Sequence, residues 1–154
     1  MNCEDYLLGY RRALEDMESL DYQIAQAESA LQGASTRYDR IGGRGGTTRA
    51  DQEARLADLM ARQARRVEEA RQVQADIDKF IQDVALDHPD GVRIRHVLHQ
   101  YYVACMSIRD IAPELRPRQI RHGWESGVTF ETVNRLRHRG LVEAQKLYDE
   151  INKG

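Results

Sequence analysis

Two long stretches of the chain repeat apolar residues with a seven-residue period, and a glycine-rich segment separates them. In the first stretch the repeat uses alternating spacings of three and four, and its members are Tyr6, Tyr10, Ala13, Met17, Leu20, Ile24, Ala27 and Leu31. Because this spacing lines one face of an α-helix, residues 6–31 predict an amphipathic helix roughly 40 Å long, at about 1.5 Å per residue. A helix of that length needs a long partner to cover its apolar face.

The partner is predicted in the same chain, because a second heptad of similar length follows. Its members are Leu56, Met60, Gln63, Val67, Ala70, Gln74, Ile77, Ile81 and Val84. Residues 33–50 lie between the two stretches and contain the run Gly42-Gly43-Arg44-Gly45-Gly46, which is too rich in glycine to continue a helix and can reverse the chain direction. We therefore expect residues 1–86 to form a long antiparallel helical hairpin, similar to a coiled coil, with a glycine-rich tip at 33–50.

Length and composition restrict the remaining possibilities. A chain of 154 residues can hold one compact domain, or an elongated module with a small globular one. Strand-like alternation of useful length is absent, so the sequence predicts an all-α fold. The acidic residues Glu4 and Asp5 stand where a signal peptide would be basic, and no apolar run approaches about 18 residues. We expect a cytoplasmic protein without a membrane segment.

The segment around Pro89 and Gly91 breaks the helical periodicity, and a second domain is predicted over residues 90–154. Apolar residues then recur at spacings of three and four from Val92 to Cys105, which indicates a helix. Ser107 precedes a short apolar-faced segment and is expected to cap a helix in which Pro113 is tolerated only if the helix is short. The inward-facing residues of that segment are expected to be Ile108, Ile111, Ala112 and Leu115.

Residues 116–127 allow two interpretations of a helix-turn-helix motif. In the first, a recognition helix runs from Pro117 to Trp124 and exposes Arg118 and Arg121. In the second, residues 116–127 are an insertion, and Thr129 caps a later helix. That later helix would bury Phe130, Val133, Leu136, Leu141, Ala144, Leu147 and Ile151. The second interpretation accounts for more residues.

The charge of the whole chain, −2, gives no argument for a nucleic-acid partner, but the charge is unevenly distributed. Residues 116–139 contain six arginines and only two acidic residues, both glutamates. An arginine can donate two hydrogen bonds to a guanine edge or to phosphate, and an asparagine can pair with adenine. The candidate DNA contacts are Asn134, Arg135, Arg137, His138 and Arg139, with Arg118 and Arg121 as the contacts of the first interpretation. The alternative is that these arginines form ordinary surface ion pairs.

Enzymatic and metal-binding functions have little support in the sequence. Cys3 and Cys105 lie 102 positions apart and form no metal-ligand motif, and His96 and His99 have no second pair of ligands nearby. Carboxylates in the heptad region are expected on wet faces, where no cavity would raise the pKa of one of them. We therefore expect a protein that is not an enzyme and that uses no metal or cofactor.

Three segments carry a resemblance to a known family. These are Leu98-His99-Gln100-Tyr101-Tyr102, Ser107-Ile108-Arg109-Asp110-Ile111-Ala112 and Val133-Asn134-Arg135-Leu136-Arg137-His138-Arg139-Gly140-Leu141. Together they resemble small phage-encoded transcriptional regulators of the ArpU and RinA type, which have a helix-turn-helix similar to sigma-factor region 4. The resemblance implies a regulator of late genes that binds double-stranded DNA. It also implies that Ser107 caps the first helix of the motif, that Ile111 and Ala112 pack it, and that the arginine-bearing helix enters the major groove.

Two other functions remain open on the sequence. One is a DNA-packaging component similar to a small terminase subunit, which also joins a helix-turn-helix to helical assembly elements. The other is a protein-interaction module or inhibitor with a degenerate helix-turn-helix, in which the hairpin binds a host or phage protein. In the leading hypothesis the apolar surface left on the hairpin makes the protein a homodimer.

Overall fold

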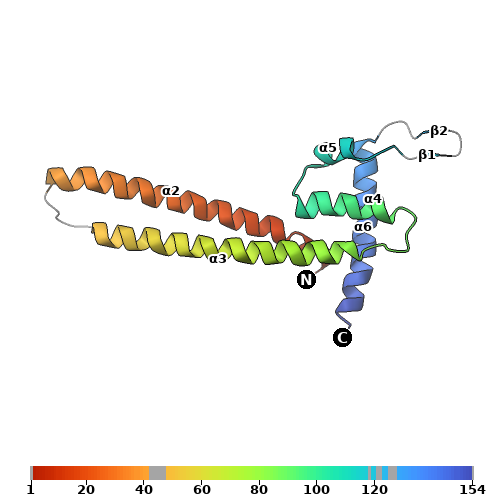
Figure 1. Cartoon of the computed structure of the whole chain (residues 1–154), viewed down its shortest axis with the longest axis horizontal. Coiled ribbons are helices and arrows are strands. Elements are labelled where there is room, and N and C mark those ends of the chain that lie inside the picture. The colour runs from red at the N-terminus through yellow and green to blue at the C-terminus, as the bar shows by residue number, and fades with distance from the viewer. Residues whose placement is uncertain (1, 42–47, 118, 121–122, 125–127, 154) are drawn as a thin grey trace. The chain divides into compact units, whose positions relative to one another are not determined.

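The computed structural model describes residues 2–41, 48–117, 119–120, 123–124 and 128–153. The all-α fold class is confirmed (Figure 1). The elements in chain order are α1 (Cys3–Leu7), α2 (Gly9–Ile41), α3 (Arg49–Gln82), α4 (Gly91–Leu98), the π-helical turn η1 (His99–Val103), α5 (Ile108–Ile111), the 3₁₀ turn η2 (Ala112–Glu114), the two-residue strands β1 (Gln119–Ile120) and β2 (Gly123–Trp124), and α6 (Phe130–Ile151). In the described part of the chain, none of these helices is long and apolar enough to cross a membrane.

The chain forms two compact units, and their limits do not follow the heptads. Residues 12–72 form one unit, and residues 1–11 together with 73–154 form the other. The sequence predicted a division between residues 86 and 90. The grouping in the structure differs because Leu7, Ile77 and Ile81, from the predicted hairpin, share a hydrophobic core with Ile94 and Val133.

In the unit of residues 12–72, α2 and α3 run side by side (Figure 1), and the Gln63 amide donates a hydrogen bond to Asp21 across them. The apolar heptad residues of α2 in this unit are all partly buried, as are Leu14 and Gln23. In α3 one predicted position is wrong, because Met60 is 52% exposed and Leu59 is buried instead. A straight helix drifts by about 20° per heptad, so either of two adjacent apolar residues can occupy the inner position.

The predicted tip at 33–50 is shorter in the structure, because α2 continues through Gly33 to Ile41. Residues 42–47, which include the glycine run, lie outside the described residues. At the start of α3 the Thr48 hydroxyl accepts from the Asp51 N–H at 3.1 Å, and Asp51 accepts from the Thr48 N–H at 3.3 Å. This reciprocal pair is a capping box that sets where α3 begins.

The first predicted helix is interrupted near its start. Asn2 caps α1 by accepting from the Asp5 N–H, and the chain leaves the helix at Leu8 before α2 begins at Gly9. The interruption places Leu7, which lies outside the heptad, in the core together with Cys3, which is in register with Tyr10. The expectation of one continuous helix from Tyr6 is therefore wrong, because burial of Leu7 outweighs the regular period.

The core of the second unit is formed mainly by the contacts of α6 with α4, α5 and α1. Its fully buried large side chains are Leu7, Ile77, Ile81, Val84, Ile94, Val97, Leu98, Tyr102, Ile111 and Val133. Val92, predicted to lie on the inner face of its helix, is 75% exposed. The helical pattern predicted to run on to Cys105 widens into η1 after Leu98, and Cys105 has a positive φ of 55°.

The motif region follows the second interpretation of residues 116–127. Ser107 caps α5 by accepting from the Asp110 N–H, and Pro113 lies in the short η2 turn, where it interrupts no longer helix. The predicted helix Pro117–Trp124 is wrong, because β1 and β2 pair in antiparallel register there, Gln119 with Trp124 and Ile120 with Gly123. Arg118 and Arg121 lie outside the described residues.

Candidate nucleic-acid interface

Helix α6 starts at a cap that the sequence predicted. The Thr129 hydroxyl accepts from the Thr132 N–H at 3.3 Å, and Phe130 is the first helical residue. The predicted buried series holds for Val133, Leu136 and Ala144, which are buried, whereas Phe130 and Ile151 are 49% and 62% exposed. Both exposed residues are at the ends of α6, where fewer neighbouring elements remain to cover them.

Gly140 determines which side of α6 packs against α4. It is buried, and a Cβ added there would lie 3.0 Å from Ile94 Cγ2 and from Leu98 Cδ2 of α4. That distance is closer than ordinary van der Waals contact, so the glycine lets the two helices approach. Because α6 meets α4 on this side, the opposite side of α6 is turned to solvent.

The solvent side of α6 carries a small cationic surface. Arg135, His138, Arg139 and Val142 are exposed and line a shallow depression together with His88 and Glu143. At 100° per residue, positions 135, 138 and 142 lie within 60° of one another around the helix. We call Arg135, His138 and Arg139 the cationic face of α6.

Arg139 is held in place by a second element. Its Nη1 lies 3.7 Å from Asp90 Oδ2, and the Asp90 side chain is only 11% exposed. The guanidinium itself remains half-exposed, so the pair orients Arg139 without removing it from solvent. Because half of its side-chain surface stays in solvent, Arg139 can contact a second anion while Asp90 orients it.

Arg137 is not on the cationic face, contrary to the expectation that it lies outside. Its side chain is 16% exposed, its Nη1 lies 3.9 Å from Glu4 Oε1, and its guanidinium lies 4.9 Å from the centre of the Tyr101 ring. The burial of Arg137 could have been predicted from the sequence, because residue 137 follows Val133 by four and precedes Gly140 by three. It therefore falls on the stripe that packs against the core.

Tyr101 lies close to a second arginine, which the sequence reasoning missed. The Arg11 guanidinium lies 4.3 Å from the Tyr101 ring centre, and Arg11 Nη2 donates to the Tyr101 and Met106 carbonyls at 2.9 and 3.2 Å. Arg11 therefore serves carbonyls at η1 and in the segment after it. Arg11 and Arg137 both pack on the Tyr101 ring, and Arg11 ties η1 to the segment that leads into Ser107.

Tyr102 is completely buried beside Tyr101, with ring centres 4.8 Å apart. Burial raises the pKa of its hydroxyl to about 12, although the nearby Arg137 guanidinium favours the ionised form. Among the described residues, none makes a well-formed hydrogen bond to the Tyr102 hydroxyl, and the Arg137 guanidinium is the polar group that acts on it. Its phenol therefore stays neutral and takes no part in proton transfer at ordinary pH.

The first helix of the motif contributes one exposed arginine beside the start of α6. The Arg109 guanidinium lies 5.5 Å from the centre of the Phe130 ring, and both residues are exposed. This contact brings α5 next to the first turn of α6. Of the other predicted contacts, Asn134 is only partly exposed.

His96 and His99, the two histidines closest to each other in the sequence, face different carboxylates. His96 Nε2 lies 3.2 Å from Glu114 Oε2, and His99 Nε2 lies 3.4 Å from Asp78 Oδ1. Gln100 also donates to Glu114, at 2.7 Å. In the described part of the chain no group of three or more histidine, cysteine or acidic residues is placed to hold a metal ion.

Comparisons with known proteins were made at three levels. No protein-family model, no curated protein and no solved structure matches this chain.

Proposed function

We propose that this protein binds double-stranded DNA through the cationic face of α6 and acts as a phage or prophage transcriptional regulator. The observation that carries the proposal is the exposure of Arg135, His138 and Arg139 on one side of a capped helix that begins beside α5. The resemblance of residues 98–141 to ArpU and RinA type regulators supplies the regulatory role. Arg137, being largely buried, is excluded from the proposed contacts.

The width and the charge of α6 suit a contact in the major groove of DNA. Helix α6 is wide enough to fill a major groove, and its exposed side presents two guanidinium groups and one imidazole with little acidic charge between them. Arg109, next to Phe130, is in place to contact phosphate beside the groove. The arginines of the cationic face then read base edges or phosphates.

The test measures binding of the full chain to duplex DNA by fluorescence anisotropy, after selection of bound duplexes from a random pool. The double variant Arg135→Ala/Arg139→Ala is expected to weaken binding at least about 30-fold, because each lost arginine contact is worth about 1–3 kcal/mol. A matched control, Arg49→Ala/Arg71→Ala, removes two exposed arginines of α3 and should leave affinity nearly unchanged.

Three results would contradict the proposal. The first is the absence of binding to any duplex at low salt. The second is an equal loss in the test and control variants, which would show that only net charge matters. An unchanged affinity in Arg135→Ala/Arg139→Ala, with binding retained, would move the DNA contact away from α6.

A further inference from the structure

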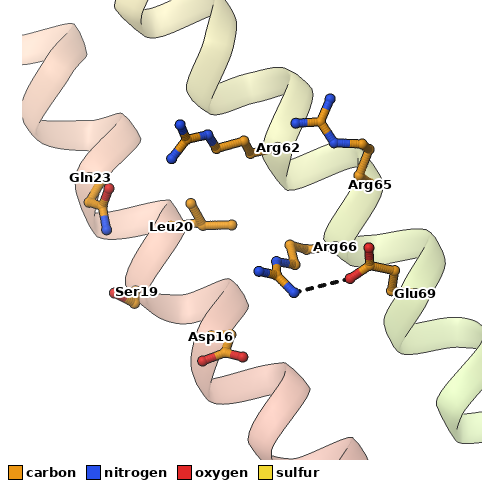
Figure 2. A pocket seen from close by; sticks show the side chains of 8 residues that line it. All are labelled: Asp16, Ser19, Leu20, Gln23, Arg62, Arg65, Arg66 and Glu69. Carbon is orange, nitrogen blue, oxygen red and sulfur yellow. Dashed lines mark hydrogen bonds and ion pairs between the residues drawn. The ribbon is translucent and has the colours of Figure 1, made fainter.

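A groove lined by three arginines lies between α2 and α3 in the unit of residues 12–72. In Figure 2, Arg62 and Arg66 extend from α3 toward α2, and Arg65 stands beside them on the same helix. The complete lining, which we call the arginine groove, is Asp16, Ser19, Leu20, Gln23, Arg62, Arg65, Arg66 and Glu69. Leu20 provides an apolar patch among these polar groups.

The arginines of the groove are only weakly engaged by their own helix. Arg62 pairs with Asp58 at 3.2 Å and Arg66 with Glu69 at 3.1 Å, and all four side chains are more than half exposed. For Arg65, the described residues provide no ion pair. Because such exposed pairs are worth at most about 1 kcal/mol, carboxylates from another molecule can replace them at little cost.

The apolar seam between α2 and α3 is only half covered. Of the apolar residues described in this unit, Leu59 and Ala70 are the buried ones, whereas the seam residues Met17, Leu20 and Ile24 remain partly exposed. Two helices alone cannot enclose a core, and helical bundles complete it with further helices. The unit therefore has apolar surface that a third and fourth helix would cover.

Charge complementarity indicates what covers it. Residues 12–33 of α2 contain one arginine and five acidic residues, which are Glu15, Asp16, Glu18, Asp21 and Glu28. Residues 55–69 of α3 contain four arginines and three acidic residues. Both halves of a complementary pair are thus present in one unit, so a twofold axis would let each copy supply what the other needs.

We propose that a second copy of this chain docks on the arginine groove. In this dimer the acidic α2 of each copy lies along the groove of the other, with Glu15 and Asp16 of one copy near Arg62 and Arg65 of the other. The four helices then close over the half-covered seam. The interface belongs to residues 12–72 and does not depend on DNA binding by α6.

The test is a charge exchange, read as molar mass by sedimentation equilibrium of the full chain without DNA. Wild type is expected to be a dimer. Arg62→Glu/Arg65→Glu and Glu15→Lys/Asp16→Lys should each raise the dimer dissociation constant at least about 100-fold, because each brings like charges together. An equimolar mixture of the two should regain the dimer, because each copy then faces an opposite charge on the other.

Two further variants keep the test decisive. Arg62→Gln/Arg65→Gln removes attraction without adding repulsion and should weaken the dimer by about tenfold while preserving the helices. Arg49→Glu/Arg71→Glu changes the net charge as much as Arg62→Glu/Arg65→Glu does but lies outside the groove, so it should remain dimeric. Circular dichroism confirms folding in each case.

Three outcomes would overturn the proposal. One is a wild-type protein that stays monomeric up to about 100 µM, far above the range of specific dimers. Another is a dimer that all groove variants retain, which would place the interface elsewhere. The third is a mixture of folded charge-exchange variants that stays monomeric.

Discussion

Tyr102 and Arg137 bury polar atoms in the second unit. The Tyr102 hydroxyl and the Arg137 Nε are both buried, and within the described part of the chain neither has a hydrogen-bond partner. A buried donor without a partner costs about 1–3 kcal/mol. Part of that cost is offset by two contacts of the Tyr101 ring. One is with the ring of Tyr102, and the other is with the guanidinium of Arg137.

Tyr102→Phe should leave the protein as stable as wild type, or more stable, at neutral pH, because it removes a hydroxyl that lacks a partner. At alkaline pH the difference should grow. The pKa of Tyr102 rises from 10.0 to about 12 on burial, so between these values the unfolded chain loses a proton that the folded chain keeps. Wild-type stability therefore falls from pH 10 upward, by about 2–3 kcal/mol at pH 12.

Urea unfolding of both proteins between pH 8 and 12 measures this effect. The pKa of the Cys3 thiol is also raised by burial, to about 11, so some alkaline loss is common to both proteins and cancels in the comparison. Parallel stability curves for wild type and Tyr102→Phe would show that Tyr102 ionises as freely in the folded as in the unfolded state.

For single residues, the sequence predicted the helix caps correctly but predicted the wrong burial for some side chains. Ser107 and Thr129 were predictable, because a cap is a local interaction between a side chain and a backbone N–H three residues away. Arg137 was placed outside because its charge was weighed above its position on the apolar stripe. Phe130 was placed inside, whereas it is 49% exposed in the first turn of α6, where its ring faces Arg109 of α5.

The close packing of α6 on α4 depends on Gly140, and substitution of this residue tests it. Gly140→Val should lower the free energy of unfolding by about 2–3 kcal/mol, because its side chain would enter space filled by Ile94 and Leu98. Gly33→Val is the matched control. Gly33 also lies within a helix, but nothing lies within 4 Å of its added Cβ, so the change should stay within about 0.5 kcal/mol.

Urea unfolding of both variants, followed by circular dichroism, measures the difference. Gly140→Val should also weaken DNA binding, since displacement of α6 would tilt the cationic face. Equal stability of the two variants would mean that α6 and α4 are not held at the distance seen here. Loss of stability without loss of DNA binding would mean that the orientation of α6 tolerates repacking.

The elements themselves were predictable to different degrees. The two long helices follow from heptad spacing, and the position of α6 follows from its cap and its period. The break between α1 and α2, the π-helical turn η1 and the β1–β2 pair carried no periodic signal. These features arise where a local pattern yields to burial, as when Leu7, which is out of register with the heptad, enters the core.

At the scale of the whole molecule, the core of the second unit joins segments from both ends of the chain. Cys3 N–H donates to Gln145 Oε1 at 3.1 Å, across 142 positions of sequence. Leu7, Ile77 and Val133 meet in the same core. Such long-range contacts leave no mark in local patterns, so the all-α class was predictable, whereas the grouping of residues 1–11 with 73–154 was not.

The two proposals together predict how DNA binding responds to salt. If a dimer neutralises about six to eight phosphates, the logarithm of its affinity should fall against the logarithm of salt concentration with a slope of roughly −5 to −7. Arg62→Gln/Arg65→Gln, studied at concentrations where it is monomeric, retains the cationic face of α6 but offers one footprint. Its slope should therefore be about half as steep, near −2.5 to −3.5.

Anisotropy titrations between about 50 and 200 mM salt, within the range where slopes are usually measured, give these values. Arg135→Ala/Arg139→Ala should remain dimeric and lose slope through missing contacts, so the two kinds of variant separate assembly from contact. If the groove variant kept the wild-type slope while monomeric, one copy would supply every phosphate contact. If Arg135→Ala/Arg139→Ala bound weakly but kept the wild-type slope, Arg135 and Arg139 would contact base edges. The phosphate contacts would then come from Arg109 and other exposed arginines.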